Sequence, residues 1–357
     1  MPETVVHVVQ HLRPGGLETL ALDLQAHAPA GSTAHVVSLD GGAEETLSAW
    51  PRLVAYGDRL HFLDKKPGLS PRAVWNLAGL FRRLGATGVV THHIGPLVYG
   101  GLAARLARVP GVVHVEHDAW HLADEAERRL QRRVLRIVRP EIIAVSPTVA
   151  GAMSRALPGC RPHVVPNGID TARFVPGDKD AARLALGLPV GVPLIGCAAR
   201  LEAVKGHEVL LGALGRMPSR IHLALAGVGS RDAELKALAA SLDIAARVHF
   251  LGRVDDMPAF YRAVDLFCLS SHDEGFPLSP LEAQACDVPA VVTDVGGCRE
   301  AVCPATGRVV PAGDPAALAL ALGLLIERRP PEEPSRFVRQ RFDIQRTVAA
   351  YHALLAA

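Results

Sequence analysis

Two cations on one predicted loop are spaced to bind a diphosphate. Arg200 and Lys205 stand five residues apart, after the apolar run Leu194–Cys197. An arginine binds phosphate oxygens through two parallel hydrogen bonds, and a lysine adds a compact point charge. The loop is not a Walker loop, because Gly-x4-Gly-Lys-Ser/Thr is absent. The alternative interpretation is two solvated surface charges.

A second charged stretch follows another strand-like run. Glu274 and Glu282 are separated by seven residues, and Gly275 between them lets a ligand approach the backbone. Pro280 is typical of the first turn of a helix, with Ser279 as its N-cap, and such a helix N-terminus attracts anions. Ser279 and Glu282 also fit a capping box, so capping is the alternative role of Glu282.

Paired glycines follow the first strand-like run. Gly15 and Gly16 let backbone N–H groups meet an anion at the start of the next helix. The alternative is a plain strand-to-helix turn. The spaced fingerprint Gly-x-Gly-x-x-Gly is absent, which disfavours a nicotinamide-dependent enzyme.

Three histidines near the end of one strand-like run raise the question of a metal. His117 and His121 could share a helix face, with His114 nearby. No third ligand is fixed by the spacing and His-Glu-x-x-His is absent, so we expect no metal. The acidic pair Asp255 and Asp256 lies at a predicted helix start, where carboxylates favour the helix dipole.

Short β-branched runs alternate with helical patterns in two successive sets. The expected strands are 5–9, 35–39, 88–91, 112–116 and 142–145, then 193–197, 221–226, 248–250, 266–269 and 290–293. This alternation predicts two doubly wound α/β domains with mostly parallel sheets. Ligands of such sheets bind outside the carboxyl ends of the strands, so we expect the site in a cleft between the domains. The turn-rich segment 166–191 marks the seam.

The composition limits the class of protein. The chain has 357 residues, 49% hydrophobic and 21% charged, which is globular, and its net charge of +2 disfavours a nucleic-acid binder. Six scattered cysteines without a Cys-x-x-Cys pair indicate neither a zinc ribbon nor a redox site and fit a reducing compartment. No signal peptide is evident, and the longest apolar stretch, about 316–326, is too short to cross a bilayer. We expect a cytoplasmic protein, or one peripheral to a membrane.

Four motifs together resemble those of the retaining family 4 glycosyltransferases of GT-B fold. They are Arg200-x4-Lys205, Glu274-x7-Glu282, Pro166-Asn167-Gly168-Ile169-Asp170 and Pro14-Gly15-Gly16-x-Glu18. Their order and spacing match over nearly the whole chain. The resemblance implies two Rossmann-like domains facing across a cleft: an acceptor-binding domain over 1–168 and a donor-binding domain over 169–341. It also implies a final helix, about 342–357, that docks back on the N-terminal domain.

The resemblance assigns roles to matching positions. It implies that Arg200 and Lys205 bind the donor diphosphate and stabilise it as it leaves. Glu274 would bind hydroxyls of the donor sugar, Glu282 the ribose, and His117 would face the sugar near its primary hydroxyl. Further implied donor contacts are Gly15, Gly16, Gly227, Gly229, Arg253, Val254, Gly275, Phe276, Pro277 and Leu278, with Glu18 and Asp118 on the acceptor side.

The implied reaction is sugar transfer with retention. The donor is a nucleotide diphosphate sugar, with UDP favoured, and the group moved is a hexosyl or N-acetylhexosaminyl group. The acceptor is a hydroxyl of a growing cell-surface glycan or lipid-linked saccharide, and neither metal nor cofactor is implied. One alternative is another GT-B enzyme, namely a sugar-nucleotide epimerase or a phosphorylase. The other alternative is an inactive sugar-binding scaffold. Release of nucleotide from sugar nucleotides distinguishes them.

One arginine-rich segment bears on where the protein works. Residues 127–139 hold six arginines interleaved with aliphatic residues. Such a helix could rest on the anionic inner face of the cell membrane. The alternative is a packed helix whose arginine face is solvated.

Overall fold

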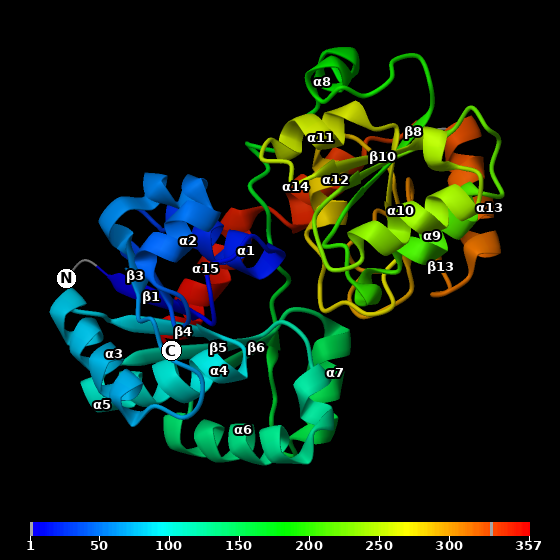
Figure 1. Ribbon diagram of the computed structural model, residues 1–357. Coiled ribbons are helices and arrows are strands. Elements are labelled where there is room, and N and C mark those ends of the chain that lie inside the picture. Colours follow the sequence, from blue (N-terminus) through cyan, green and yellow to red (C-terminus); the bar gives the residue numbers. More distant parts are fainter. Residues whose placement is uncertain (1–2, 329–330) are drawn as a thin grey trace. The chain divides into compact units, whose positions relative to one another are not determined.

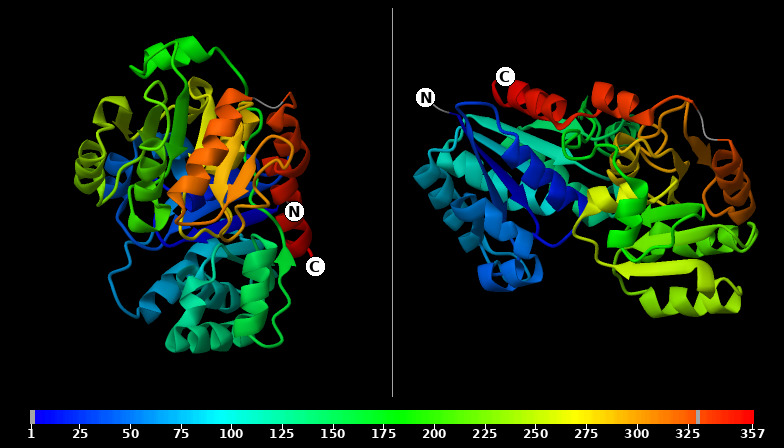
Figure 2. Two further views of the ribbon diagram at one scale, coloured as in Figure 1. Left: turned by 90° about the vertical axis from the view of Figure 1, so that its right-hand side faces the viewer. Right: turned by 90° about the horizontal axis from the view of Figure 1, so that it is seen from above.

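The computed structural model describes residues 3–328 and 331–357 and divides the chain into two compact units (Figure 1). The first unit runs to Gly168 and includes Ile344–Ala357; the second is Ile169–Asp343. Each unit has one sheet, and every strand pairing among the described residues is parallel. Figure 2 shows helices on both faces of each sheet. The predicted pair of doubly wound α/β domains is confirmed.

The first sheet has the order β3-β2-β1-β4-β5-β6-β7. Its strands are β1 (Thr4–Val9), β2 (Thr33–Ser38), β3 (Leu60–Phe62), β4 (Gly88–His92), β5 (Gly111–Glu116), β6 (Glu141–Ala144) and β7 (His163–Val164). Its helices are α1 (Gly16–Ala26), α2 (Ala43–Ala49), α3 (Pro71–Leu84), α4 (Ile94–Pro96), α5 (Leu102–Ala107), α6 (Glu125–Val138), α7 (Pro147–Ala156) and α15 (Ile344–Leu355), with the 3₁₀ segments η1 (Pro51–Arg59) and η3 (Trp120–Ala123) and the π-helical segment η2 (Leu97–Gly101).

The second sheet has the order β10-β9-β8-β11-β12-β13. Its strands are β8 (Leu194–Ala198), β9 (His222–Ala226), β10 (Val248–Gly252), β11 (Leu266–Leu269), β12 (Ala290–Thr293) and β13 (Arg308–Val310). Its helices are α8 (Lys179–Ala185), α9 (His207–Leu214), α10 (Asp232–Ser241), α11 (Met257–Ala263), α12 (Ser279–Ala285), α13 (Pro315–Glu327) and α14 (Pro334–Arg341), with turns η4 (Ala203–Lys205) and η5 (Ala245–Arg247).

The central strands of each sheet form one side of the hydrophobic core of their unit. In the first unit, Val6 and Val89 lie under Leu77 and Phe81 of α3, and all four are buried. Because helices cover both faces of a parallel sheet, such strands are apolar on both sides and read as continuous Val, Ile and Leu runs. The same rule explains the second core, where strands and helices bury a comparable set of aliphatic side chains.

A break in the helical structure separates the last two helices of the chain. α14 ends at Arg341, and α15 begins at Ile344, two residues later than the expected start. The backbone N–H of Ile169 donates to the Phe342 carbonyl at 2.8 Å, which fixes this break to the start of the second unit. α15 then lies beside α1 in the first unit (Figures 1 and 2).

Candidate functional site

Lys205 and Glu274, which the family resemblance assigns to the same sugar donor, contact each other in the second unit. Lys205 follows β8, Glu274 follows β11, and Lys205 Nζ lies 2.5 Å from Glu274 Oε1. The Ser271 hydroxyl donates to the same carboxylate oxygen at 2.7 Å. The side chains keep 17% and 10% of their surface exposed. They form a mostly buried ion pair with an accessible edge.

Backbone contacts hold the lysine loop against the end of β11. The Ser270 hydroxyl donates to the Gly206 carbonyl at 2.9 Å, and the His272 N–H donates to the Val204 carbonyl at 2.8 Å. Gly206 has φ +61°, and a Cβ there would lie 2.1 Å from the Ser270 carbonyl oxygen. Only glycine allows this approach, so the loop geometry depends on it.

Arg200 lies on the same loop, but its side chain is exposed and outside the ion pair. Its carbonyl accepts a hydrogen bond from His207 Nε2 at 3.0 Å, which fixes the backbone but leaves the guanidinium in solvent. Glu202 accepts hydrogen bonds from the Ser230 N–H at 2.9 Å and from its hydroxyl at 2.6 Å. The cationic loop is thereby joined to the loop after β9.

The glycines of the loop after β9 pack directly against the backbone. A Cβ on Gly227 would lie 2.0 Å from the Ala199 carbonyl oxygen, and one on Gly229 would lie 2.4 Å from that of Leu201. The Leu201 N–H donates to the Val228 carbonyl at 3.0 Å. Close packing of two loops therefore accounts for both glycines, and nucleotide contact by either stays a prediction.

Glu282 receives a hydrogen bond from a buried tyrosine. The Tyr261 hydroxyl of α11 donates to Glu282 Oε2 at 2.5 Å. Burial, and then the charge of Glu282, raises the pKa of Tyr261 well above its ordinary value. α12 begins at Ser279, one residue before Pro280. The prediction of Ser279 as the N-cap is therefore wrong: it lies within the first turn, and the cap position is Leu278.

The segment Gly275–Leu278 is buried in the second unit. The ring of Phe276 packs 5.6 Å from that of Phe342, measured between centroids, so its side chain belongs to the core. Pro277 is likewise buried. Any ligand contact in this segment falls to the backbone.

Sequence reasoning missed a pair of glycines that supports this segment. The Gly297 N–H donates to the Gly275 carbonyl at 2.8 Å. Gly296 has φ +52°, and a Cβ there would lie 1.6 Å from the Glu274 carbonyl oxygen. Two adjacent glycines, which begin three residues after the predicted strand 290–293, were the available signal.

The segment after β10 is ordered by its own aspartates. Arg253 Nε lies 2.9 Å from Asp255 Oδ1, and Val254 is half-buried. Asp256 accepts a hydrogen bond from the Ala259 N–H at 3.0 Å and caps α11. The predicted helix start at the acidic pair is confirmed.

In the first unit, a carboxylate lies beside the paired glycines. Gly15 is extended and Gly16 begins α1. A Cβ on Gly15 would lie 2.3 Å from Glu18 Oε2, and His11 Nδ1 lies 3.1 Å from Glu18 Oε1. A helix N-terminus attracts negative charge, and at α1 the carboxylate of Glu18, in the first turn of the helix, supplies that charge.

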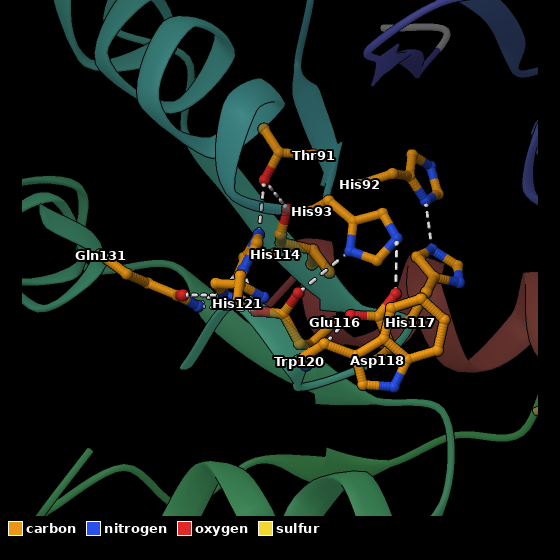
Figure 3. Close-up of polar contacts among 11 residues, drawn as sticks. Thr91, His92, His93, His114, Glu116, His117, Asp118, Trp120, His121 and Gln131 are labelled. Carbon is orange, nitrogen blue, oxygen red and sulfur yellow. Dashed lines mark hydrogen bonds and ion pairs between the residues drawn. The ribbon is translucent and has the colours of Figure 1, made fainter. Parts of the chain in front are cut away.

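His117 stands at the end of a row of buried histidines, of which Figure 3 shows the contact between His117 and His92. Its Nε2 lies 2.9 Å from His92 Nδ1, and His92 Nε2 lies 3.2 Å from His7 Nδ1. Burial holds the pKa of His117 and of His92 well below the ordinary value and lowers the pKa of His7 to about 3. All three imidazoles are therefore neutral at pH 7.

Glu116, which sequence reasoning passed over, organises the neighbouring side chains (Figure 3). It is fully buried and lies 3.2 Å from His93 Nδ1, 3.3 Å from His114 Nε2 and 2.6 Å from Gln131 Nε2. Burial alone would raise the pKa of Glu116, but hydrogen bonds from His114 and His93 outweigh it and lower the pKa. The available signal was a carboxylate at the end of the expected strand 112–116, whose one other polar residue is His114.

Asp118 lies on the other side of His93. His93 Nε2 is 3.6 Å from Asp118 Oδ2, and Asp118 Oδ1 accepts a hydrogen bond from the Trp120 N–H at 3.3 Å. Burial lowers the pKa of His93, but Glu116 and then Asp118 overcome it, so that pKa is raised. His93 also has φ +71°, a strained conformation for a residue with a side chain.

The three histidines considered as metal ligands do not converge. His114 and His121 both face Glu116, at 3.3 and 3.6 Å, whereas His117 faces His92. Among the residues that the structure describes, no group of three or more His, Cys, Asp or Glu side chains is arranged to hold a metal ion. Nor does any helix in the described ranges have the length and apolarity needed to cross a membrane.

Two family models match consecutive parts of the chain. "Glycosyltransferase Family 4" matches residues 14–173, and "Glycosyl transferases group 1" matches residues 178–341. The solved structure of HepE from Anabaena in complex with UDP-glucose has a TM-score of 0.85 and 25% identity, covering 99% of each chain.

Curated relatives match over a shorter stretch. A D-inositol 3-phosphate glycosyltransferase of Mycolicibacterium gilvum (strain PYR-GCK) is 36% identical over 211 residues, which is 57% of this chain and 46% of the relative. The lipopolysaccharide core biosynthesis mannosyltransferase LpsB of Rhizobium meliloti (strain 1021) is 36% identical over 179 residues, 47% of this chain and 51% of the relative. The aligned part spans about half the length of these relatives.

Proposed function

Because the chain belongs to the group 1, family 4 glycosyltransferases, we propose that it transfers a sugar from a nucleoside diphosphate sugar to an acceptor hydroxyl. The observation that carries the proposal is the contact between Lys205 and Glu274 at the carboxyl ends of β8 and β11. That edge of a parallel α/β sheet is where ligands bind. The pair offers a cation for phosphate and a carboxylate for sugar hydroxyls.

The cations act on the leaving group. As the bond to the sugar breaks, negative charge grows on the departing diphosphate, and Lys205 and Arg200 stabilise it by preorganised electrostatics. Ser271 and the Lys205 ammonium hold the carboxylate of Glu274 in place, so this carboxylate orients the sugar. Glu282, fixed by Tyr261, binds the ribose. Transfer proceeds with retention of the anomeric configuration.

The substrates are proposed at the level of class. UDP is the favoured nucleotide, supported by the UDP-glucose complex of the structurally similar HepE. The sugar is a hexosyl or N-acetylhexosaminyl group. A cell-surface glycan or lipid-linked saccharide is the favoured acceptor, supported by the lipopolysaccharide-core relative.

The test follows products directly. The full chain is incubated with UDP-, GDP- and ADP-sugars and simple saccharide acceptors, and the products are identified by proton NMR. Transfer with retention yields nucleoside diphosphate and a glycoside of unchanged anomeric configuration. A new sugar nucleotide would indicate an epimerase and a sugar 1-phosphate a phosphorylase. No conversion with any donor would favour a sugar-binding scaffold.

The reaction needs no metal ion, since Arg200 and Lys205 supply the positive charge. Activity is expected to persist in excess chelator. Loss of activity that manganese or magnesium restores would contradict this and return His117, Asp118 and His121 to consideration as ligands.

The protein meets a lipid-embedded acceptor at the inner face of the membrane through α6. Arg133 and Arg136 are exposed, and Ile137, which follows Arg136 and lies one turn after Arg133, is 61% exposed. Arg128 instead donates to the Leu122 carbonyl at 3.2 Å, and Arg132 is half-buried, so not every arginine of this helix faces solvent. Each exposed arginine near an anionic surface contributes about 1 kcal/mol of binding.

Vesicle sedimentation tests the membrane contact. Binding is expected with anionic but not neutral vesicles, and it should fall at high salt, where charges are screened. Arg133→Glu with Arg136→Glu should abolish it, while Lys236→Glu in the second unit should not. Equal recovery with both vesicle types, or no effect of the double variant, would leave α6 an ordinary solvated helix.

A further inference from the structure

One tryptophan of the first unit is held exposed at the carboxyl edge of the sheet. Trp120 begins η3, shortly after the end of β5, and is 49% exposed. The same turn is anchored through Leu122, which is buried and whose carbonyl accepts a hydrogen bond from Arg128 at 3.2 Å. The turn is therefore fixed to the unit, while its indole is accessible at the edge where parallel α/β sheets bind ligands.

A carboxylate two residues before this indole is held by two contacts. Asp118 Oδ1 accepts a hydrogen bond from the Trp120 N–H at 3.3 Å, and Asp118 Oδ2 faces His93 Nε2 at 3.6 Å (Figure 3). The side chain of Asp118 keeps 20% of its surface exposed. A carboxylate offers about four acceptor positions, so these two contacts leave others for the hydroxyls of a ligand.

His93 holds Asp118 from a rigid support. Its Nδ1 lies 3.2 Å from the buried carboxylate of Glu116, and Gln131 Nε2 donates to the other oxygen of that carboxylate at 2.6 Å. Because a carboxylate only accepts, His93 donates from Nδ1. The charges of Glu116 and Asp118 favour the imidazolium form, which also donates from Nε2. Glu116 thereby orients the His93 ring, and the ring orients Asp118.

The backbone of His93 adopts a conformation that a side chain rarely allows. Its φ of +71° and ψ of 174° lie in a region that is essentially limited to glycine. Such strain persists only where the surrounding contacts hold it, and it is concentrated at functional sites. At His93, Glu116 and Asp118 supply those contacts.

The charges beside the indole favour a neutral ligand. Glu116 and Asp118 repel an anion, and the imidazolium of His93 repels a cation from Asp118. A purely apolar partner would cover the indole but would bury the Asp118 carboxylate without a new hydrogen bond, which is costly. A sugar ring suits both groups, because it has an apolar C–H face for the indole and hydroxyls for the carboxylate.

We propose that Trp120 and Asp118 form a subsite for one neutral sugar ring of the acceptor, with His93 as a positioning residue for Asp118. The indole stacks on the C–H face of the ring, and the carboxylate accepts hydrogen bonds from its hydroxyls. All three residues belong to the first unit. The use of the bound sugar as an acceptor rests on the proposed glycosyltransferase function.

Fluorine-19 NMR of the full chain labelled with 5-fluorotryptophan tests sugar binding without an activity assay. The tryptophans at 50, 75 and 120 give three signals, which Trp120→Phe and Trp75→Phe assign. The probes are the methyl glycosides of glucose, galactose, mannose and N-acetylglucosamine, with tetramethylammonium as a cationic probe.

The Trp120 signal is expected to shift saturably with at least one glycoside. Trp75 is the matched control, because it is 63% exposed on α3 of the same unit, and its signal should not shift. No shift of the Trp120 signal with any glycoside, a shift with tetramethylammonium instead, or an equal shift of both signals would overturn the proposal.

Two variants of His93 separate positioning from a structural role. His93→Gln keeps an N–H near the Nε2 position that faces Asp118, whereas His93→Leu removes it. Both variants lose the contact from Nδ1 to Glu116 and share the same backbone strain. Asp118→Asn and His93→Leu should each weaken glycoside affinity about tenfold, and His93→Gln should recover most of it. Equal affinities of the two His93 variants would contradict the positioning role.

Steady-state kinetics connect the subsite to sugar transfer. Trp120→Ala should raise the KM for a saccharide acceptor about tenfold and leave the KM for the donor unchanged, whereas Trp75→Ala should change neither. An unchanged acceptor KM in Trp120→Ala, or a raised donor KM instead, would contradict the acceptor role. Absence of transferase activity in the unmodified chain, with the Trp120 shift retained, would count against the proposed function and leave the sugar subsite standing.

Discussion

At the scale of single residues, the charge of Lys205 is balanced before any ligand binds. Its ammonium contacts Glu274, whereas the guanidinium of Arg200 is exposed. An anionic donor would therefore add its diphosphate to a site that already holds one carboxylate. We expect Arg200 to supply positive charge to the diphosphate, because Glu274 contacts Lys205 and not Arg200.

Lys205→Ala and Arg200→Ala should each lower kcat by roughly 10²–10³-fold, the usual effect of removing one group that stabilises transition-state charge. The melting temperature should change little for Arg200→Ala, because this side chain is exposed. Lys236→Ala, which removes an exposed ion pair with Asp232, is the control. Near-normal kcat in both loop variants would contradict the assignment of Arg200 and Lys205 to the donor diphosphate.

The two glutamates should separate catalysis from binding. Glu274→Gln should lower kcat while nucleotide affinity stays nearly intact, because it acts on the sugar. Glu282→Ala should weaken nucleotide binding. Tyr261→Phe, which removes only the hydrogen bond to Glu282, should have a smaller effect in the same direction. Steady-state kinetics measure kcat, and calorimetry measures nucleotide affinity. Weakened nucleotide binding in Glu274→Gln, together with a lowered kcat and normal nucleotide binding in Glu282→Ala, would mean that the roles of the two glutamates are exchanged.

At the scale of elements, the central strands were predictable, whereas of the four edge strands that the structure describes only β10 was predicted and β3, β7 and β13 were not. The run Leu266–Leu269 is a strand with the expected bounds because it is buried on both faces and therefore uniformly apolar. Leu60–Phe62 and His163–Val164 lie at the sheet edges, are short and contain histidine, so no apolar run marks them. The break at Phe342 was hidden because the helical pattern continues across it.

The candidate site was predictable only in part, for a related reason. Arg200, Lys205 and Glu274 were recognisable because each follows a strand at the ligand-binding edge. The row of His7 and His92 was not, because residues 85 positions apart become neighbours only through strand pairing. Sequence spacing carries no information about that pairing.

The support beneath Glu274 can be tested at Gly296. Gly296→Ala adds a Cβ 1.6 Å from the Glu274 carbonyl oxygen at a positive φ, so the segment must move. We expect loss of stability of about 2 kcal/mol or more together with reduced kcat. Gly313→Ala, at φ +73° with open space around it, is the matched control and should cost about 1 kcal/mol without loss of kcat. Similar thermal denaturation and kcat for the two variants would contradict this account.

At the scale of the whole molecule, the buried neutral histidines make the first unit sensitive to acid. The folded pKa of His7 is lowered to about 3 from 6.5, so its contribution to stability is present above pH 6.5 and lost as the pH falls toward 3. At pH 5 the loss from His7 alone is about 2 kcal/mol. His92 and His117 act in the same direction, whereas the raised pKa of His93 stabilises below pH 6.5 and partly offsets them.

Tryptophan fluorescence measures this effect in one unit, because all three tryptophans, at 50, 75 and 120, lie in the first. The urea midpoint should fall between pH 8 and pH 5, and His7→Gln should make it fall less. A midpoint that is the same at both pH values would show that these histidines are not held neutral by burial.

The central claim is that the loops after β8 and β11 bind the donor diphosphate. Calorimetric titration of the full chain with UDP, and in turn GDP and ADP, tests it most directly. We expect saturable binding of one nucleotide per chain, with UDP favoured. Lys205→Ala should weaken this binding about tenfold or more, and Lys236→Ala should leave it unchanged. Saturable binding that Lys205→Ala leaves unaffected, or no binding of any of the three nucleotides, would contradict it.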